Sequence, residues 1–150
     1  MRIYEAEAND TLYARMISLS AGWEAEESCH GYRTNTEDDL RGRRIFVAEE
    51  DGEIVGYLFG LSAKAKEESS VIEKDAAYFE IEELYVIPAR RSEGIGRGLF
   101  ALCEAAARRA GLRQIMLSTA TKDWKRVLHF YLDELGMEFW NARLFKRLEN

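Results

Sequence analysis

The sequence contains few of the residues that build disulfide frameworks, metal centres or nucleophilic active sites. It has two cysteines, Cys29 and Cys103, and two histidines, His30 and His129, among its 150 residues. Two cysteines are too few for the framework of a small secreted domain. Cys103 shares a helical apolar stripe, which favours a buried thiol. Neither histidine has neighbours of the types that a zinc site or a nucleophile–histidine pair needs, so we predict no metal site.

Long apolar runs are also missing. No stretch approaches the ~20 apolar residues of a membrane span, and the first seven residues, Met1 to Glu7, lack the apolar core of a secretion signal. The net charge of −6 disfavours nonspecific binding to nucleic acid or to acidic membranes. We therefore expect one domain over residues 1–150, located in the cytoplasm, with neither nucleic acid nor membrane as a partner.

Two common nucleotide-binding motifs are absent. The sequence has no Gly-x-x-x-x-Gly-Lys-Ser/Thr run, which excludes the phosphate loop of nucleotide hydrolases. A dinucleotide-binding unit would place Gly-x-Gly-x-x-Gly behind a strand and an acidic residue at the end of the next strand. The glycines here are Gly94, Gly96 and Gly98, and the next expected strand ends in Leu117-Ser118-Thr119, without an acid.

A glycine- and arginine-rich segment follows a strand-like run that ends at Val86. Its glycines open a long helix, and glycine lets the backbone come close to a ligand. The first turn of that helix presents unpaired N–H groups and the positive end of the helix dipole. Arg90, Arg91 and Arg97 add positive charge. The segment predicts an anion cradle that suits a diphosphate.

The hydrophobic pattern predicts a mixed sheet with helices on both faces, an α/β fold. The expected strands cover residues 2–6, 45–48, 54–61, 78–86 and 115–118, with a hairpin turn at Asp51-Gly52. The expected helices begin at Asn9 and Asp10, at Gly94 and at Trp124, the last two running to Ala110 and Leu135. A polar region at 22–44 and a charged connection at 63–77 lie between them, and strands at 137–140 and 142–146 form a final hairpin.

The strand at 78–86 contains an irregularity. Phe79 and Ile81 follow one parity of the strand, whereas Leu84 follows the other, and the slip falls at Glu82-Glu83. A strand whose alternation fails in this way is expected to carry a β-bulge.

Together these features resemble a known family. The pattern Arg91-x-x-Gly94-x-Gly96 resembles the acyl-CoA signature of the GNAT N-acetyltransferase superfamily, and Phe130-Tyr131-x-x-x-x-Gly136-Met137 follows in family order. The resemblance is close over residues 78–146 and only architectural before them. It implies the GNAT fold, a central mixed and mostly antiparallel sheet with helices on both faces. One departure is Trp124, which stands where the family often has an asparagine that contacts the cofactor.

The resemblance implies an N-acetyltransferase that uses acetyl-CoA as co-substrate, with direct attack in a ternary complex, no acyl-enzyme and no metal. The contacts to acetyl-CoA that it implies are Leu84, Tyr85, Val86, Arg91, Ser92, Glu93, Gly94, Ile95, Gly96 and Arg97. The expected bulge frees backbone N–H groups near Leu84 to Val86. The resemblance implies that this strand segment binds the pantetheine arm and the thioester carbonyl.

Acetyl transfer to an amine requires a base and benefits from an acid. A lysine-like amine, with a pKa of ~10.4, is mostly protonated at pH 7. Glu82, at the expected bulge, is the first candidate for the base; Glu80, Glu83 and a water chain without a single base are the alternatives. Tyr131 is the candidate acid, because a tyrosine pKa of ~10 keeps the hydroxyl protonated. The alternative for Tyr131 is packing in an apolar stripe.

The acceptor is the least constrained part of the prediction. Carboxylates beside aromatic rings suit a small cationic amine, such as a polyamine, an aminosugar or a basic amino acid. These residues are Trp23, Glu24, Glu26, Glu27, Tyr32, Glu37, Asp38 and Asp39, with Glu67, Glu68, Glu73 and Asp75 further on. Exposed charges without a ligand are the alternative.

Other functions left open are acetylation of a protein N-terminus or lysine, and a non-catalytic acyl-CoA sensor. A homodimer that uses the C-terminal hairpin is a further expectation.

Overall fold

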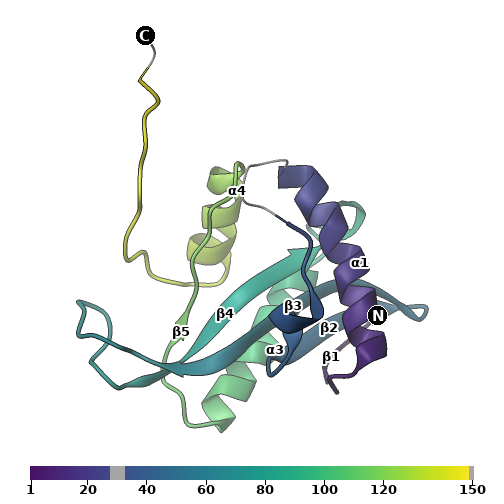
Figure 1. Cartoon of the computed structure of the whole chain (residues 1–150), viewed down its shortest axis with the longest axis horizontal. Coiled ribbons are helices and arrows are strands. Elements are labelled where there is room, and N and C mark those ends of the chain that lie inside the picture. Colours follow the sequence, from purple (N-terminus) through teal and green to yellow (C-terminus); the bar gives the residue numbers. More distant parts are fainter. Residues whose placement is uncertain (28–32, 149–150) are drawn as a thin grey trace.

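Five strands form one sheet in the order β1-β2-β3-β4-β5 (Figure 1). The computed structural model describes residues 1–27 and 33–148. The first four strands, β1 (Arg2–Ala6), β2 (Arg44–Glu50), β3 (Glu53–Lys64) and β4 (Ala77–Val86), pair antiparallel, and β5 (Ile115–Met116) runs parallel to β4. The predicted mixed, mostly antiparallel sheet is confirmed.

Helices cover both faces of this sheet, as predicted (Figure 1). One face carries α1 (Asp10–Glu27) with the short α2 (Glu37–Leu40), and the other carries α3 (Ile95–Arg109), which follows the 3₁₀ turn η1 (Pro88–Arg90). Near the C-terminus, α4 (Trp124–Leu128) continues into a π-helical turn, η2 (His129–Glu134). In the part of the chain that is described, no helix combines the length and apolarity needed to cross a membrane.

Two hydrophobic clusters fill the space between the sheet and its helices. On one face, Leu99 and Cys103 of α3 are fully buried against residues such as Leu58 of β3. On the other, Met16 of α1 packs with Tyr57. Burial raises the pKa of the Cys103 thiol to about 12, so Cys103 is a core thiol, as predicted. Cys29 and His30 lie outside the described residues.

Local signals in the sequence explain several boundaries. The side chain of Asn9 accepts a hydrogen bond from the Leu12 N–H at 2.8 Å, which caps the start of α1. Asp51 and Gly52, with φ of 51° and 81°, form the turn between β2 and β3. Positive φ at both central residues matches the twist of a two-residue hairpin, so this turn is confirmed.

The predicted bulge lies in β4 at Glu82. The register pairs Phe59 with Glu83 and Gly60 with Ile81, which leaves Glu82 as the extra residue. Because the alternation shifts there, Ile81 and Leu84 both contribute to the cluster beside α3. Glu83 instead accepts hydrogen bonds from residues on the α1 side.

Strand and helix lengths differ from those predicted. β3 extends to Lys64 and pairs with β4 back to Ala77, where a charged connection was expected. Polar side chains are tolerated there because this end of the hairpin projects beyond the core (Figure 1). α1 reaches Glu27, beyond the expected start of the polar region at Gly22. β5 has only two paired residues, because the chain leaves β4 after Met116.

The predicted C-terminal hairpin is wrong. Residues 137–148 form no strand: residues 137–140 stay beside β5, and the last described residues extend away from the sheet (Figure 1). Trp140 donates its indole N–H to Ser70 Oγ at 3.1 Å, and the chain beyond it is exposed, with Leu144 at 94%. Aromatic and other apolar residues indicate strand propensity only, and a strand needs a neighbour that completes its hydrogen bonds.

Gly60 lies opposite the bulge, and we predict that Gly60→Ala destabilises the fold. A Cβ at residue 60 would lie 2.0 Å from the Glu80 carbonyl oxygen. This oxygen belongs to the backbone of the paired strand, so it cannot move aside without disturbing the sheet. We expect the free energy of unfolding to fall by about 3 kcal/mol. Gly52→Ala is the control, because residue 52 has open space and only its positive φ is strained, which costs roughly 1 kcal/mol. Equal losses in urea unfolding of the two variants would contradict the packing argument.

Candidate functional site

A cleft of about 1060 Å³ opens where β4 and β5 separate. The two strands pair only at Phe79↔Ile115 and Glu80↔Met116, so from Glu82 to Val86 no described strand lies on the β5 side of β4, while β3 pairs along its other edge. Residues 117–121 and η2 form the facing wall, and the C-terminal end of α1 closes one side. The cleft therefore exposes a strand edge whose backbone groups can bind an extended ligand.

The start of α3 forms one end of the cleft. Ser92 and Gly94 adopt positive φ of 65° and 82°, and Gly94 is the N-cap of the helix. The Gly98 N–H donates to the Gly94 carbonyl at 3.0 Å, so the N–H groups of residues 95–97 come before the helical ladder begins. A Cβ at Gly96 would lie 3.0 Å from Cζ of Phe130, so Gly96 also lets η2 pack closely. This helix start can hold an anion.

Arg91 ties the cleft walls together. Its Nε donates to the Val86 carbonyl at 2.9 Å, and its terminal nitrogens pair with both oxygens of Glu26 at 2.7 and 2.9 Å. The Tyr85 hydroxyl donates to the same carboxylate at 2.8 Å. Burial pushes the pKa of Glu26 upward, but the hydrogen bonds from Arg91 and Tyr85 outweigh it, so the pKa is lowered overall. The predicted ligand contact Arg91 thus anchors α1 to the end of β4.

The other two predicted cations differ from each other. Arg90 also lines the cleft, but its guanidinium forms ion pairs with Glu50 and with Glu93, the latter at 2.8 Å. Arg97, in the first turn of α3, forms no ion pair with a described residue and lines the cleft. Of the three arginines, Arg97 has the positive charge that is not already neutralised.

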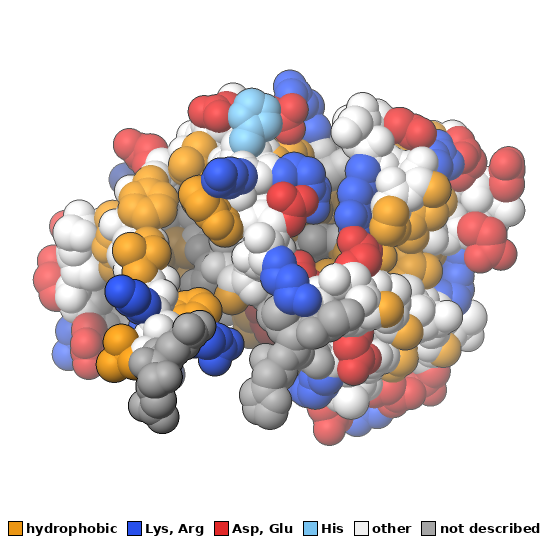
Figure 2. All heavy atoms as spheres, turned by 90° about the horizontal axis from the view of Figure 1, so that it is seen from above, with side chains coloured by type: hydrophobic (Ala, Val, Ile, Leu, Met, Phe, Trp, Pro, Cys, Tyr) orange, Lys and Arg blue, Asp and Glu red, His pale blue; other side chains and the backbone are white. Residues whose placement is uncertain are grey.

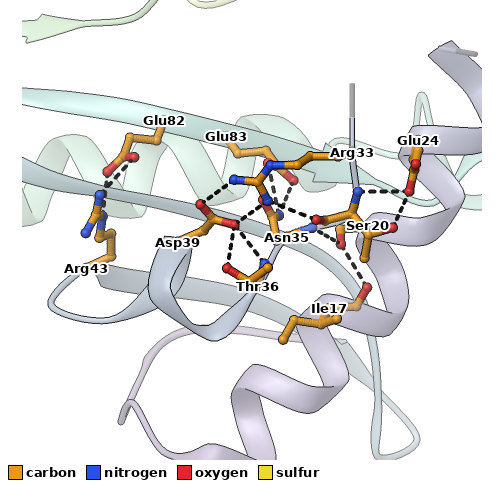
Figure 3. Close-up of polar contacts among 11 residues, drawn as sticks. Ile17, Ser20, Glu24, Arg33, Asn35, Thr36, Asp39, Arg43, Glu82 and Glu83 are labelled. Carbon is orange, nitrogen blue, oxygen red and sulfur yellow. Dashed lines mark hydrogen bonds and ion pairs between the residues drawn. The ribbon is translucent and has the colours of Figure 1, made fainter. Parts of the chain in front are cut away.

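Glu82 and Glu80, two of the three candidate bases, have different surroundings. The Glu82 carboxylate accepts from Arg43 at 2.7 and 3.3 Å and lines the cleft (Figure 3). Glu80 is half-buried, and its pKa is raised by burial and by the charge of Glu82. Glu80 is not among the described residues that line the cleft.

Glu83 has an environment that the sequence alone does not reveal. Its carboxylate accepts from Asn35 Nδ2 at 3.1 Å on each oxygen and from the hydroxyl of the fully buried Tyr57 (Figure 3). Burial raises the pKa of Glu83, the nearby charges of Asp39 and Glu82 raise it further, and the hydrogen bonds from Tyr57 and Asn35 offset part of the rise. The direct partners are neutral, so Glu83 is a carboxylate in the cleft that forms no ion pair with a described residue.

The segment that carries Asn35 is anchored to α1. The Asn35 N–H donates to Oγ of the buried Ser20 at 3.0 Å, and Ser20 in turn donates to the Ile17 carbonyl at 2.8 Å (Figure 3). The Thr34 N–H donates to Glu24 at 2.8 Å. These residues are distant in sequence from Glu83, and no motif marks them, so only the folded chain identifies Asn35 as its partner.

The predicted acidic residues for an acceptor divide into two groups. Glu26 and Glu27 line the cleft together with Trp23. The others do not line the cleft. Glu24 accepts a hydrogen bond from Thr34, and Asp39 pairs with Arg33. Glu37 and Asp38 both pair with Arg41. The acidic residues further along the chain are also absent from the lining: Glu67, Glu68, Glu73 and Asp75. Tyr32 lies outside the described residues.

Tyr131 lies in η2 and lines the cleft, as does Glu82. Burial raises the pKa of its hydroxyl to about 12, so the group carries its proton at neutral pH. Its neighbour Phe130 packs on Gly96, so the π-helical turn brings one aromatic ring to the helix start and the other into the cleft. π-helical turns often occur at functional sites.

His129 pairs with Asp133 on the surface, with 2.7 Å between Nδ1 and Oδ2. Within residues 1–27 and 33–148, no group of three or more His, Cys, Asp or Glu side chains is placed to hold a metal ion.

The fold is shared with solved proteins of low sequence identity. A tetramutant of the BH1408 protein from Bacillus halodurans is 20% identical, with a TM-score of 0.73 over 99% of this chain and 100% of that one. An aminoglycoside acetyltransferase, meta-AAC0020, from an uncultured soil metagenomic sample is 19% identical, with a TM-score of 0.69 over 99% and 96%. The aminoglycoside N-acetyltransferase AAC(6')-Iy, solved with CoA, is 16% identical, with a TM-score of 0.66 over 99% and 100%. At such identities the likeness shows the fold alone.

Among curated proteins, none matches the chain. The model of the acetyltransferase (GNAT) family matches residues 9–137, which is most of the sequence and includes α3, the bulged strand and η2. The resemblance inferred from the glycine loop is thereby confirmed: the chain belongs to the GNAT acetyltransferase family.

Proposed function

We propose that the protein transfers the acetyl group of acetyl-CoA to a primary amine of a small cationic molecule, by direct attack in a ternary complex. Membership of an acetyltransferase family supports the reaction class. The main support is a single cleft that brings three features together: the start of α3, which can hold an anion, the bulged edge of β4, and Tyr131. A cytoplasmic location remains a prediction of the sequence.

In this proposal acetyl-CoA binds along β4, with its diphosphate at the start of α3. The N–H groups of residues 95–97 and the unpaired charge of Arg97 would face the diphosphate. The pantetheine arm would hydrogen-bond to the free edge at Leu84 to Val86. Ser92, Glu93 and Gly94 remain predicted contacts through their loop. Arg91 would act chiefly by holding this loop and α1 in place, because its guanidinium is committed to Glu26.

A carboxylate at the bulge would accept the proton of the amine. The sequence singles out Glu82, whose carboxylate is already held in an ion pair with Arg43. Glu83 has neutral partners and a raised pKa, nearer to the pH of catalysis. We therefore favour Glu83 as the base and retain Glu82 as the alternative that the experiments below distinguish.

Tyr131 would donate a proton to the leaving thiolate. Its hydroxyl is protonated at neutral pH and has no hydrogen-bond partner among the described residues, so it is available to a ligand. The hydroxyl would thus supply the leaving-group proton that the reaction needs.

A cationic acceptor suits the charge of the cleft beyond the bulge. Glu26, Glu27, Glu82 and Glu83 all line it, beside Trp23. Glu26 and Glu82 are balanced by arginines, so Glu27 and Glu83 supply the charge that a bound ammonium group would meet. Solved proteins of the same fold named aminoglycoside acetyltransferases make an aminosugar our first choice within this class. Acetylation of a protein amine and acyl-CoA sensing without turnover are the competing functions.

A thiol-release screen tests the function. Purified protein is given acetyl-CoA with polyamines, aminosugars, basic amino acids and peptides with acidic or neutral N-termini, at low and high salt. We expect small polycations to be the best acceptors, with a KM that rises with salt as charges are screened. Preference for a peptide N-terminus without a salt effect would indicate protein acetylation. Binding of acetyl-CoA without thiol release for any amine would indicate a sensor.

The cofactor assignment predicts a charge effect confined to one end of α3. Arg97→Glu places a carboxylate at the proposed diphosphate site and should weaken acetyl-CoA binding at least about tenfold, or ~1.4 kcal/mol, measured by calorimetry. Arg109→Glu makes the same charge change in the last turn of the same helix, outside the cleft, and should bind like the wild type. Equal affinities for the two variants would contradict the assignment.

The base assignment predicts different pH profiles for two neighbouring glutamates. The base must be deprotonated, so wild-type kcat should rise with pH through the raised pKa of Glu83. Glu83→Gln should lower kcat by about 100-fold and abolish that rise. Glu82→Gln should keep the rise and lose less activity. If Glu82→Gln instead abolishes the rise, Glu82 is the base; if both variants keep it, neither residue is.

The acid assignment predicts that Tyr131→Phe lowers kcat by about 100-fold while acetyl-CoA affinity stays unchanged, since only the hydroxyl is lost. Steady-state kinetics and calorimetry measure the two quantities. Phe130→Leu is a packing control in the same turn, expected to alter cofactor affinity through its contact with Gly96. A kcat for Tyr131→Phe within about threefold of wild type would mean that the ring only packs there.

A further inference from the structure

The short segment before α2 is held more firmly than its lack of secondary structure suggests. Residues 33–36 form neither helix nor strand, so no helical or sheet ladder satisfies their backbone groups. Three consecutive N–H groups instead donate to side-chain oxygens: Thr34 to Glu24 at 2.8 Å, Asn35 to Ser20 at 3.0 Å and Thr36 to Asp39 at 2.7 Å (Figure 3). Side chains of α1 and α2 therefore fix this segment in place.

Ser20 anchors the middle position of the segment. Its side chain is fully buried, and its hydroxyl accepts from the Asn35 N–H while it donates to the Ile17 carbonyl at 2.8 Å. Burying a hydroxyl is unfavourable unless it forms hydrogen bonds, and here its donor and an acceptor site are both used. Ser20 thus determines where the backbone of Asn35 lies, although neither residue lines the cleft.

The Asn35 side chain meets the Glu83 carboxylate symmetrically. Its Nδ2 lies 3.1 Å from each carboxylate oxygen, and the Tyr57 hydroxyl also donates to Oε1 (Figure 3). Each carboxylate oxygen can accept about two hydrogen bonds. Oε1 therefore has both of its sites occupied, whereas Oε2 accepts from Asn35 alone among the described residues and keeps a site for a proton or a water.

The group that orients Glu83 is an amide, although cations are plentiful nearby. Lys and Arg side chains alternate with Asp and Glu on the side of the molecule where α4 and the end of α1 lie (Figure 2). Arg43 pairs with Glu82, and Arg33 pairs with Asp39. A cation beside a carboxylate favours its charged form and so opposes proton uptake. An amide can fix the same carboxylate without adding charge.

We infer that Asn35 is a positioning residue, held by Ser20, that fixes the Glu83 carboxylate so that Oε2 is the atom that accepts the proton of the amine. This inference rests on the proposed role of Glu83. The amine N–H bond breaks, the proton moves to Oε2, and the nitrogen keeps the electron pair that attacks the thioester carbon. The neutral Glu83 carboxyl returns its proton to water afterwards, while Asn35 neither gains nor loses one.

The surroundings of Glu83 determine how a change at Asn35 will appear in a titration. The titratable groups that act on Glu83 are Tyr57 on β3, Asp39 on α2, and Glu82 and Tyr85 on β4. The network reaches α1 through the Ser20 hydroxyl, which does not titrate in the range of interest. The Asn35 hydrogen bond favours the carboxylate, so its loss should raise the pKa of Glu83 further.

The variant Asn35→Asp tests the inference through the pH profile of kcat. It replaces the donor by a negative charge of the same size, so the rise of kcat should move upward by about one pH unit, with a roughly tenfold lower kcat at neutral pH. Acetyl-CoA affinity should stay unchanged. Asn9→Ala, which removes the cap at the other end of α1, is the control and should leave the profile in place. An unmoved profile in Asn35→Asp would overturn the inference.

A double-mutant cycle shows whether the network acts through Glu83. Ser20→Ala removes the anchor and should lower kcat several-fold with an unchanged KM for acetyl-CoA, with circular dichroism confirming the fold. In a Glu83→Gln background, neither Asn35→Asp nor Ser20→Ala should lower kcat further. Equal losses in the two backgrounds would mean that both residues only support the fold, and would overturn the inference.

An NMR titration of the Glu83 carboxyl carbon, without acceptor or cofactor, separates this inference from the proposed function. We expect Glu83 to titrate at higher pH in Asn35→Asp than in the wild type. If its titration does not move, Asn35 does not act on Glu83 and the inference fails while the proposed function stands. If the titration moves but the kcat profile does not follow, Glu83 is not the base, and the base assignment and the inference fail together.

Discussion

The extra residue in β4 is the constraint on which the site depends. Glu82 has no partner on β3, and the close approach of Gly60 to the Glu80 carbonyl leaves no room for a side chain opposite it. Because the bulge shifts the strand by one residue, Glu83 faces Tyr57 and Asn35, while Leu84 returns to the core beside α3. A regular strand would place Glu83 on the α3 face, in the hydrophobic core.

The cleft follows from the strand that comes next. β5 pairs with β4 over two residues before the chains separate, so the edge beyond the bulge remains open to a ligand. The bidentate pair between Arg91 and Glu26 then holds α1 against the end of β4. Arg91 thus contributes to the shape of the cleft, because its charge is already paired with Glu26. Arg97 lines the same cleft and is the arginine whose charge is available to an anion.

Several elements of the fold were predictable because they depend on local sequence patterns. The bulge followed from a parity slip, the hairpin turn from Asp51-Gly52, and the helix after Gly94 from its apolar stripe. The C-terminal hairpin was not, because strand pairing depends on the neighbour that a segment meets in the fold, and residues 137–148 pair with no described strand. The environment of Glu83 was equally hidden, since Asn35 and Tyr57 reach it from distant parts of the sequence.

The sequence by itself determined the family, the order of most elements and the residue types that line the cleft, because these depend on spacing along the chain. The tertiary structure decided which charges are already neutralised. Glu82 is paired with Arg43, Arg91 with Glu26 and Arg90 with Glu50, whereas Glu83 and Arg97 are not paired with a described opposite charge. A formal charge can be read from a residue's identity, but its neutralisation depends on side chains that only folding brings within a few ångströms.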